Sequence, residues 1–226
     1  MPERIPLAAI LAGGKGRRMG GRDKARMEFL GAPLIERVFA AVEPLADRVI
    51  VVGGGEYLIR RGVPTIPDRF PGASALGGIA TALAWARENV GPGAWVLCLA
   101  CDMPWIRREV LNLVWSRRDE AQVVVPRVEA GYEPLCALYR ESALEVLVER
   151  ISAGDLSILR AFPRLRTVEV GEEEVRRIDP DLRTFLNLNR PGDIKQAEAL
   201  ATETGVVGAS APGSSLPGVS SPRGAG

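Results

Sequence analysis

The chain has 226 residues, of which 46% are hydrophobic and 25% are charged, a composition typical of globular proteins rather than disordered ones. Its 29 basic and 28 acidic side chains give a net charge of +1, which argues against the broad basic surface of a dedicated nucleic-acid-binding protein. The chain contains no histidine, so the commonest general base and the commonest zinc ligand are both excluded.

Cysteine content and the length of the apolar runs bear on the compartment. Three cysteines favour a reducing environment over a secreted disulfide framework. The longest apolar run, residues 94–101, is far shorter than the about 20 residues that span a membrane. Residues 5–12 imitate the core of a signal peptide but lack a small-residue cleavage site after them. We therefore expect a soluble, cytoplasmic protein that contacts neither membrane nor nucleic acid.

Short β-rich runs alternate with helical apolar patterns along the chain. A helix is expected to begin at Pro33 and to stop before Pro44. Further helices are expected around the apolar stripes at 76–83, 106–114 and 144–151, and strands at 5–11, 48–52, 63–66, 95–100, 122–126 and 136–139. Runs that are apolar on both faces are typical of parallel strands covered by helices on each side. The pattern therefore predicts an α/β fold with three α/β/α layers, Rossmann-like, around a mostly parallel sheet.

The C-terminal segment differs from the rest in composition. Residues 205–226 include six Gly, three Pro and five Ser, or 14 of 22 residues, and the only charged side chain is Arg223. Such a segment buries too little apolar surface to offset the entropy lost on ordering. We expect one folded domain over residues 1–204 and a disordered tail over residues 205–226.

A glycine-rich, basic loop follows the first predicted strand. Five of the nine residues from Gly13 to Gly21 are glycine, and six basic side chains with one acid lie between Lys15 and Arg26. Glycines let a backbone approach a ligand closely and turn its N–H groups toward an anion. The loop matches neither the dinucleotide fingerprint nor the P-loop. We interpret it as a polyphosphate-binding loop, and the alternative is a flexible basic surface loop.

Asp102 follows the strand predicted at 95–100, where parallel α/β sheets bind their ligands. A carboxylate beside a polyphosphate would repel it unless a divalent cation lay between them, and Mg²⁺ binds to one or two carboxylates together with phosphate oxygens. The alternative is a helix cap, because the next helix is expected to begin near Trp105. Nearby, Cys98 and Cys101 are expected to face opposite sides of the sheet, so we interpret them as buried, inert thiols rather than zinc ligands.

These motifs together resemble those of molybdenum cofactor guanylyltransferases, a branch of the nucleotidyltransferases. The signature loop reads L-A-G-G-x-x-x-R-M-G-G-x-D-K over residues 11–24. The order continues with P-D at 67–68, L-G-G at 76–78, C-D-M-P at 101–104, E-P-L-C-A-L-Y at 133–139 and F-L-N-L-N at 185–189. The resemblance implies a nucleotidyltransferase fold.

The resemblance also implies a reaction and its residues. GTP and Mg²⁺ bind, the terminal phosphate of molybdenum-molybdopterin attacks the α-phosphorus, and molybdenum guanine dinucleotide and pyrophosphate form. Because a phosphate monoester is already anionic, this chemistry needs no strong general base, and it depends on positioning and charge neutralisation. Asp102 is expected to hold the metal, and Arg18 and Lys24 to stabilise the leaving pyrophosphate. The implied binding residues are Leu11, Ala12, Gly13, Gly14, Lys24, Asp68, Gly78, Asp102, Asn187 and Asn189.

Several points stay open. Asn187 and Asn189 are expected at the metal or acceptor side of the site. The alternative is that their side chains hold a turn before the last helix. Gly53-Gly54-Gly55 stands where the family often has a polar residue. Glu133 replaces a neutral or basic residue, which is unfavourable beside an anionic phosphate unless its carboxylate accepts N–H bonds from the pterin ring. The partner molybdoenzyme or chaperone is not specified by the sequence.

Rival functions are of two classes. The first is another nucleotidyltransferase of the same fold, acting as a cytidylyl, phospholactate-guanylyl or sugar-phosphate enzyme. The second is a catalytically silent GTP-binding module that regulates a partner. Base preference separates the enzymes from one another, and release of pyrophosphate excludes the silent module.

Overall fold

A computed structural model describes residues 3–13, 24–53, 58, 61–119, 121–188 and 191–203 of the chain. Gly14, Arg18, Asn189 and the tail from residue 205 lie outside these residues, so the expectations for them and for the domain boundary stay predictions. Among the described residues, no helix is both long and apolar enough to cross a membrane.

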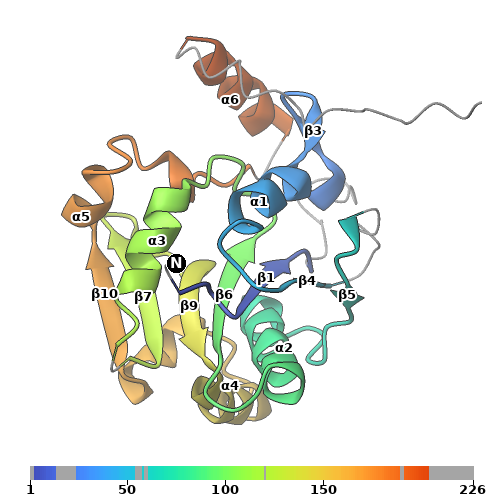
Figure 1. The fold of residues 1–226 in the computed structure, drawn as a ribbon, viewed down its shortest axis with the longest axis vertical. Coiled ribbons are helices and arrows are strands. Elements are labelled where there is room, and N and C mark those ends of the chain that lie inside the picture. The colour runs from blue at the N-terminus through green and yellow to red at the C-terminus, as the bar shows by residue number, and fades with distance from the viewer. Residues whose placement is uncertain are drawn as a thin grey trace, which may run out of the picture.

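One central sheet organises the molecule (Figure 1). Its strands are β1 (Leu7–Leu11), β4 (Val49–Val52), β5 (Thr65–Ile66), β6 (Trp95–Ala100), β7 (Val123–Val128), β8 (Gly131–Tyr132), β9 (Cys136–Arg140) and β10 (Thr167–Gly171). Their order is β10-β7-β9-β6-β1-β4-β5, with β8 paired to β7. Most neighbours are parallel, whereas β9 runs antiparallel to both β6 and β7. The mostly parallel sheet is confirmed.

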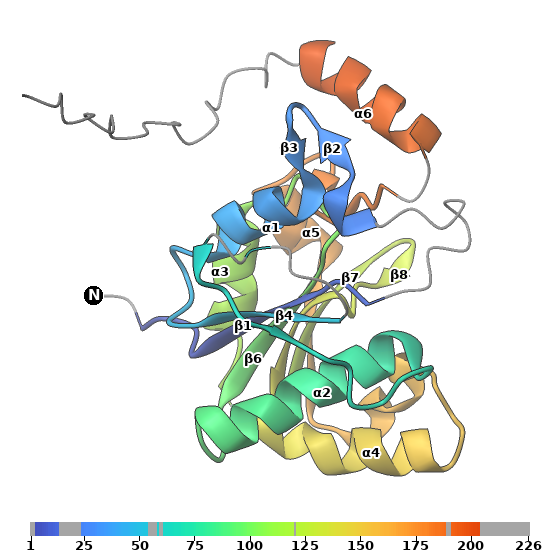
Figure 2. The same ribbon diagram turned by 90° about the vertical axis from the view of Figure 1, so that its right-hand side faces the viewer.

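Helices cover both faces of this sheet, and this confirms the three layers (Figure 2). On one face lie α2 (Ser74–Asn89) and α4 (Leu144–Ser152); on the other lie α1 (Leu34–Val42), α3 (Arg108–Ser116) and α5 (Glu172–Arg176). Because strand side chains alternate, β1 contributes Ala8 and Ile10 to the α1/α3 core and Leu7 and Ala9 to the α2/α4 core. Buried apolar contacts on both faces fix the strands in register.

A smaller unit stands above the sheet. It consists of the hairpin β2 (Glu28–Phe29) with β3 (Ala32–Pro33) and the last helix, α6 (Pro191–Glu203). Phe29, Leu34, Leu188 and Ala197 form a separate apolar cluster between them. Figure 2 shows α6 lying over this hairpin. The short 3₁₀ helix Lys24–Arg26 lies directly before this hairpin in the chain.

Most predicted elements are present, with local differences. Pro33 ends β3 and precedes α1 instead of being its first residue, and α3 begins at Arg108, two residues after Ile106. Strand β5 is two residues long, against four expected. The hairpin β2–β3, strands β8 and β10 and helix α5 were not predicted.

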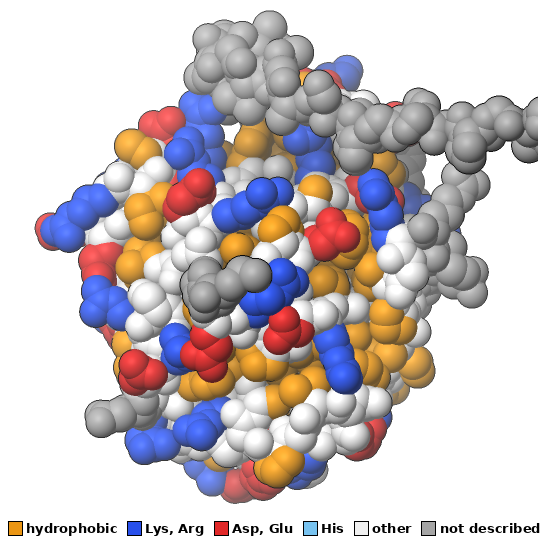
Figure 3. All heavy atoms as spheres, viewed as in Figure 1, with side chains coloured by type: hydrophobic (Ala, Val, Ile, Leu, Met, Phe, Trp, Pro, Cys, Tyr) orange, Lys and Arg blue, Asp and Glu red, His pale blue; other side chains and the backbone are white. Residues whose placement is uncertain are grey.

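The charged surface agrees with the near-zero net charge. On the face that carries the N-terminus, Lys and Arg side chains are interspersed with Asp and Glu (Figure 3). Arg4, for example, pairs with Asp47 at 2.9 Å. Such exposed pairs contribute little to stability but keep the field of the protein weak.

Candidate functional site

The carboxyl ends of β4, β1 and β6 meet at one edge of the sheet. One residue beyond β1, the Ala12 N–H donates to the Val52 carbonyl at 2.8 Å, and the Cys101 N–H donates to the Leu11 carbonyl at 3.3 Å. The chain after β1 is therefore held between its two neighbours up to Gly13. Ligands of parallel α/β sheets bind at this edge.

Gly53 lets the loops after β1 and β4 touch. Its φ is +139°, and a β-carbon there would lie 2.7 Å from the Gly13 nitrogen and 2.9 Å from the Ala12 carbonyl carbon. A side chain at this position would therefore displace the backbone of the expected nucleotide loop. This close approach gives a physical reason for glycine at position 53, where the family often has a polar residue.

Two glycines at the start of α2 also allow close approach. A β-carbon on Gly78 would lie 3.3 Å from Leu11 Cδ1, so Gly78 packs directly on the end of β1. A β-carbon on Gly77 would lie 2.6 Å from the Phe70 carbonyl oxygen. The helix N-terminus, the loop before it and the end of β1 are thus brought together, and two of the expected nucleotide-side residues, Leu11 and Gly78, are in contact.

Asp68 is held in this loop by its own carboxylate. Its Oδ1 accepts from the Phe70 N–H at 2.9 Å and from the Thr81 hydroxyl at 3.0 Å, and Thr81 Oγ1 accepts from the Arg69 N–H at 2.9 Å. The buried Thr81 thereby ties residues 68–70 to α2. Sequence reasoning missed Thr81, although a lone hydroxyl inside the apolar stripe of a helix was the available signal.

Lys24 and Asp102 meet at the same edge. The Lys24 ammonium lies 3.3 Å from Asp102 Oδ2, and the Asp102 side chain is 13% exposed. Asp102 lies two residues after the end of β6, and Lys24 opens a short 3₁₀ helix, Lys24–Arg26, before the hairpin β2–β3. The sequence placed both residues in the site, and the structure brings them together.

The backbone of Asp102 is also fixed. Its carbonyl accepts from the Leu188 N–H at 3.0 Å, which places the exposed Asn187 one residue from this contact. The Asn187 amide donates to the Phe185 carbonyl at 3.4 Å, in line with the turn-tying alternative, and the acceptor-side role of Asn187 stays a prediction. Asp102 does not cap α3, because Arg107 occupies the N-cap position.

The carboxylate of Asp102 is the group at this edge that the sequence assigned to a metal. Among them, no group of three or more Asp, Glu, Cys or His side chains is arranged to hold an ion. Mg²⁺ commonly takes one or two carboxylates and completes its shell with phosphate oxygens and water. Asp102 therefore fits a magnesium ion that is shared with a nucleotide, whereas it does not fit an all-protein metal site.

Glu133 lies where the hairpin β7–β8 continues toward this edge. Its N–H donates to the Pro126 carbonyl at 2.9 Å, and its carbonyl accepts from the Cys136 N–H at 3.0 Å. Burial raises the pKa of its carboxyl to about 7. In its protonated form this carboxyl would not repel an anionic acceptor.

The cysteines behave as predicted. All three are buried free thiols, with Cys98 on the α2/α4 side of the sheet and Cys101 and Cys136 on the α1/α3 side. Burial raises the pKa of the Cys98 and Cys136 thiols, so both are protonated at neutral pH. Their packing supports the interpretation as inert core residues.

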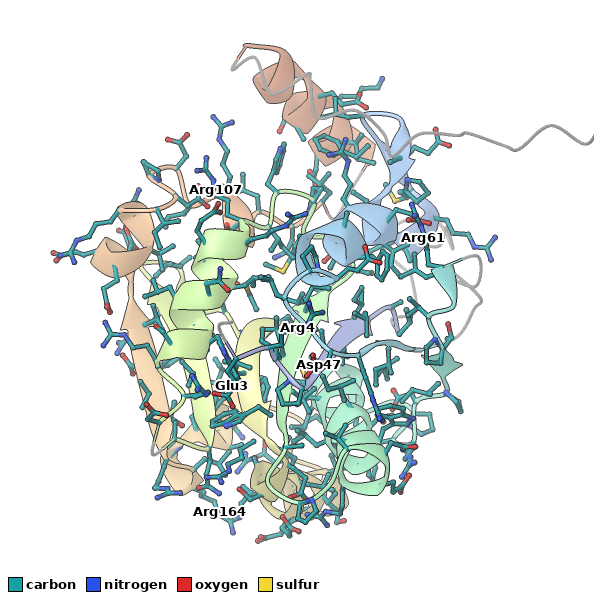
Figure 4. All side chains as sticks on the ribbon, in the orientation of Figure 1. Glu3, Arg4, Asp47, Arg61, Arg107 and Arg164 are labelled. Atoms are coloured by element: carbon teal, nitrogen blue, oxygen red, sulfur yellow. The ribbon has the colours of Figure 1, made fainter. Side chains whose placement is uncertain are left out.

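A hollow of about 400 Å³ lies at the opposite edge of the sheet, beside the amino ends of β4 and β5. Arg4, Asp47 and Arg61 border it (Figure 4). Its basic groups are already engaged, because Arg4 pairs with Asp47 at 2.9 Å and Arg61 with Glu36 at 3.4 Å. We therefore place the functional site at the carboxyl edge and not in this hollow.

Comparisons with known proteins show the family to which the chain belongs. Residues 8–168 match the family model of the MobA-like NTP transferase domain. The chain is 33% identical over 193 residues to the molybdenum cofactor guanylyltransferase of Desulfosudis oleivorans, an alignment that covers 84% of this chain and 93% of that protein. It is also 33% identical over 218 residues to a probable molybdenum cofactor guanylyltransferase of Chloroflexus aggregans, covering 91% and 100%.

Solved structures show the same fold. Molybdopterin-guanine dinucleotide biosynthesis protein A from Archaeoglobus fulgidus superposes with a TM-score of 0.72 at 30% identity, covering 87% of this chain and 99% of that one. The 2-C-methyl-D-erythritol 4-phosphate cytidylyltransferase of Thermus thermophilus gives 0.60 at 17% identity, covering 88% and 100%, which is a likeness of fold alone.

Proposed function

The chain belongs to the family of MobA-like NTP transferases, and from this premise we propose that it transfers GMP from GTP to the terminal phosphate of molybdenum-molybdopterin. The products are molybdenum guanine dinucleotide and pyrophosphate. The observation that carries the proposal is the pairing of Asp102 with Lys24 at 3.3 Å beside the end of β1. It unites a metal-binding carboxylate and a phosphate-binding cation at one edge of the sheet.

Guanylyl transfer is favoured over the rival nucleotidyl transfers. Relatives named as molybdenum cofactor guanylyltransferases align over most of the chain, while the cytidylyltransferase shares only the fold. A silent GTP-binding module is disfavoured because the charged pair needed at a reacting phosphate is present. We infer a cytoplasmic reaction, since three free buried cysteines suit a reducing compartment.

Asp102 is the residue that would hold magnesium. A bound Mg²⁺ would neutralise phosphate charge and orient the reacting groups. The carboxylate is positioned for this before any ligand arrives, because its backbone is held by Leu188 and its side chain by Lys24. Rigid placement of this kind lowers the reorganisation required in the transition state.

The remaining residues bind and orient the substrates. The backbone of Ala12 and Gly13 lies against Gly53, and the Leu11 side chain lies against Gly78, so these contacts would fix the course of the chain where the nucleotide binds. Lys24 would stabilise negative charge on the departing pyrophosphate, and Arg18 is assigned the same role from the sequence motif. Asn187 would bind on the acceptor side, next to Asp102.

The acceptor needs little activation. A phosphate monoester is an anion at neutral pH, so its oxygen can attack without a strong general base, and the chain has no histidine to supply one. Catalysis then rests on alignment and charge neutralisation. A receiving molybdoenzyme or its chaperone would take the product.

The test is incubation of the full chain with Mg²⁺, GTP and molybdenum-molybdopterin, with detection of pyrophosphate and of a guanine-containing pterin product. Matched reactions contain CTP or omit the pterin. Formation of both products with GTP supports the proposal. Preference for CTP would establish a cytidylyltransferase, and GTP binding without pyrophosphate would establish a regulatory module.

A further inference from the structure

Asp179 is a fully buried carboxylate that lies outside the residues assigned so far. Its exposed fraction is 0%, and it follows α5 on the α1/α3 side of the sheet. Burial of a carboxylate is unfavourable unless hydrogen bonds and an opposite charge compensate for it. Its partners therefore indicate why the fold retains a charge there.

Those partners belong to two different segments. Asp179 Oδ2 accepts from the Thr184 N–H at 2.7 Å, and Oδ1 lies 3.5 Å from Arg107 Nε without a hydrogen bond from the described residues. The Thr184 hydroxyl in turn accepts from the Arg107 N–H at 3.3 Å, and Arg107 Nη1 donates to the Ile178 carbonyl at 3.1 Å. Arg107 lies at the start of α3 (Figure 4).

The same two segments meet again at the site. Arg107 ends the loop that begins at Asp102 after β6, and the Asp102 carbonyl accepts from the Leu188 N–H. Residues 179–188, which we call the strap, are thus attached to this loop at both ends. Leu182 within the strap has a φ of +52°, an unfavourable conformation for a non-glycine residue that the surrounding contacts must maintain.

We propose that Asp179 is a positioning residue, which acts through Thr184 and Arg107 to hold the strap against the Asp102 loop for transfer to the acceptor. This inference rests on the proposed function. Asp179 touches neither substrate in this scheme; it fixes where Asn187 lies relative to Asp102. A misplacement of the order of 1 Å at such a contact is enough to slow a reaction about 100-fold.

The fold provides a matched control at the other edge of the sheet. Glu141 is also a buried carboxylate, and it accepts from the Gly93 N–H at 3.1 Å and pairs with Arg87. It follows Arg140, which pairs with Trp95 at the amino end of β6, and so lies at the end of this strand opposite to Asp102. Glu141→Gln removes the same kind of charge without touching the strap.

The experiment compares Asp179→Asn, Thr184→Val, Thr184→Ser and Glu141→Gln with the wild type. We expect kcat for pyrophosphate release to fall at least 10-fold in Asp179→Asn and Thr184→Val, while KM for GTP changes less than about twofold because the nucleotide residues lie elsewhere. Thr184→Ser keeps the hydroxyl that accepts from the Arg107 N–H, so its kcat should match that of the wild type. Glu141→Gln should keep wild-type kinetics.

Amide hydrogen exchange supplies an independent measurement. We expect the Leu188 amide to exchange at least 10-fold faster in Asp179→Asn and Thr184→Val, and at the wild-type rate in Glu141→Gln. Wild-type kcat in the first two variants, or unchanged Leu188 exchange, would overturn the inference. Failure of the proposed function can be distinguished from failure of this inference, because the wild-type chain itself would then release no pyrophosphate. If Asp179→Asn does not fold, the comparison of Thr184→Val with Thr184→Ser still tests the inference.

Discussion

The ammonium of Lys24 lies 3.3 Å from the carboxylate of Asp102, although 78 residues separate them in the sequence. The ion pair joins the end of the glycine loop to the end of β6. A metal ion that binds Asp102 must therefore share the carboxylate with Lys24 or displace its ammonium toward the phosphates. On the proposed function, both residues would therefore respond to the arrival of a metal–nucleotide complex.

Asp102→Ala is expected to abolish turnover and leave the fold intact. The variant removes the anchor for the metal at the reacting phosphates, and loss of a preorganised electrostatic group typically costs at least about 100-fold in rate. Steady-state pyrophosphate release and circular dichroism check the two parts. Near-normal activity of the variant at saturating Mg²⁺ would remove Asp102 from the metal-binding role.

Gly53→Ala is expected to weaken GTP binding and destabilise the fold. The new β-carbon would lie 2.7 Å from the Gly13 nitrogen, and the positive φ adds a strain of about 1–3 kcal/mol. Gly62→Ala is the control, because Gly62 also has a positive φ, +70°, but a β-carbon there meets nothing within 4 Å.

Isothermal titration with GTP and urea denaturation separate the two contributions. Both variants should lose stability, and only Gly53→Ala should lose affinity for GTP. Equal affinities would mean that the contact between Gly53 and Gly13 does not shape the nucleotide loop.

Part of this architecture was readable from local sequence. The run Trp95–Ala100 is apolar on both faces, and its predicted and observed bounds coincide. Asp102 was placed at the ligand edge because residues directly after parallel strands lie there. In contrast, β10 includes Thr167 and Glu169, so its apolar pattern is interrupted, and it was missed.

Other features depend on contacts between distant segments. The insertion of antiparallel β9 between β6 and β7 is a matter of strand order, which apolar runs do not encode. Two further hydrogen bonds, from Leu188 to Asp102 and from Thr81 to Asp68, join segments whose local sequence patterns do not predict that they meet. Sequence reasoning therefore predicted the edge of the sheet at which we propose the site, but not the hydrogen bonds at that edge.

Glu133 gives the stability of the protein a pH dependence. Burial raises the pKa of its carboxyl from its ordinary value of 4.5 to about 7, so the folded chain holds this proton more tightly than the unfolded chain. Its contribution is therefore fully present below pH 4.5 and is lost as the pH rises through 7.

Glu133→Gln, a neutral variant of similar shape, should remove this loss. We expect it to match the wild type in urea denaturation at pH 4.5 and to be more stable by about 1–3 kcal/mol at pH 8. Glu129→Gln on the same hairpin is the exposed control and should show no such difference. Identical stability of Glu133→Gln and the wild type at pH 8 would contradict the assignment.

Base preference is the most direct test of the guanylyl assignment. Guanine presents a paired donor edge, N1–H and N2–H₂, and cytosine has no such pair. The Leu11 carbonyl already accepts from the Cys101 N–H, so the Ala12 carbonyl or the Asp68 carboxylate is the better acceptor for this edge. Sites built on hydrogen bonds reject analogues that leave them unpaired, and we expect GTP to be preferred over CTP and ATP by at least about 100-fold in kcat/KM.

Asp68→Asn tests which substrate atoms this residue contacts. An asparagine oxygen can still accept from the Phe70 N–H and the Thr81 hydroxyl, so the loop should keep its shape. If the carboxylate reads the base, the preference for GTP narrows; if it binds the ribose hydroxyls, kcat/KM falls for all three nucleotides together. Thr81→Val is the control for loop displacement, because it removes the tie to α2 and retains the carboxylate. Steady-state kinetics with GTP, CTP and ATP on the three proteins decides between these outcomes, and a wild-type enzyme that favours CTP would end the guanylyl assignment.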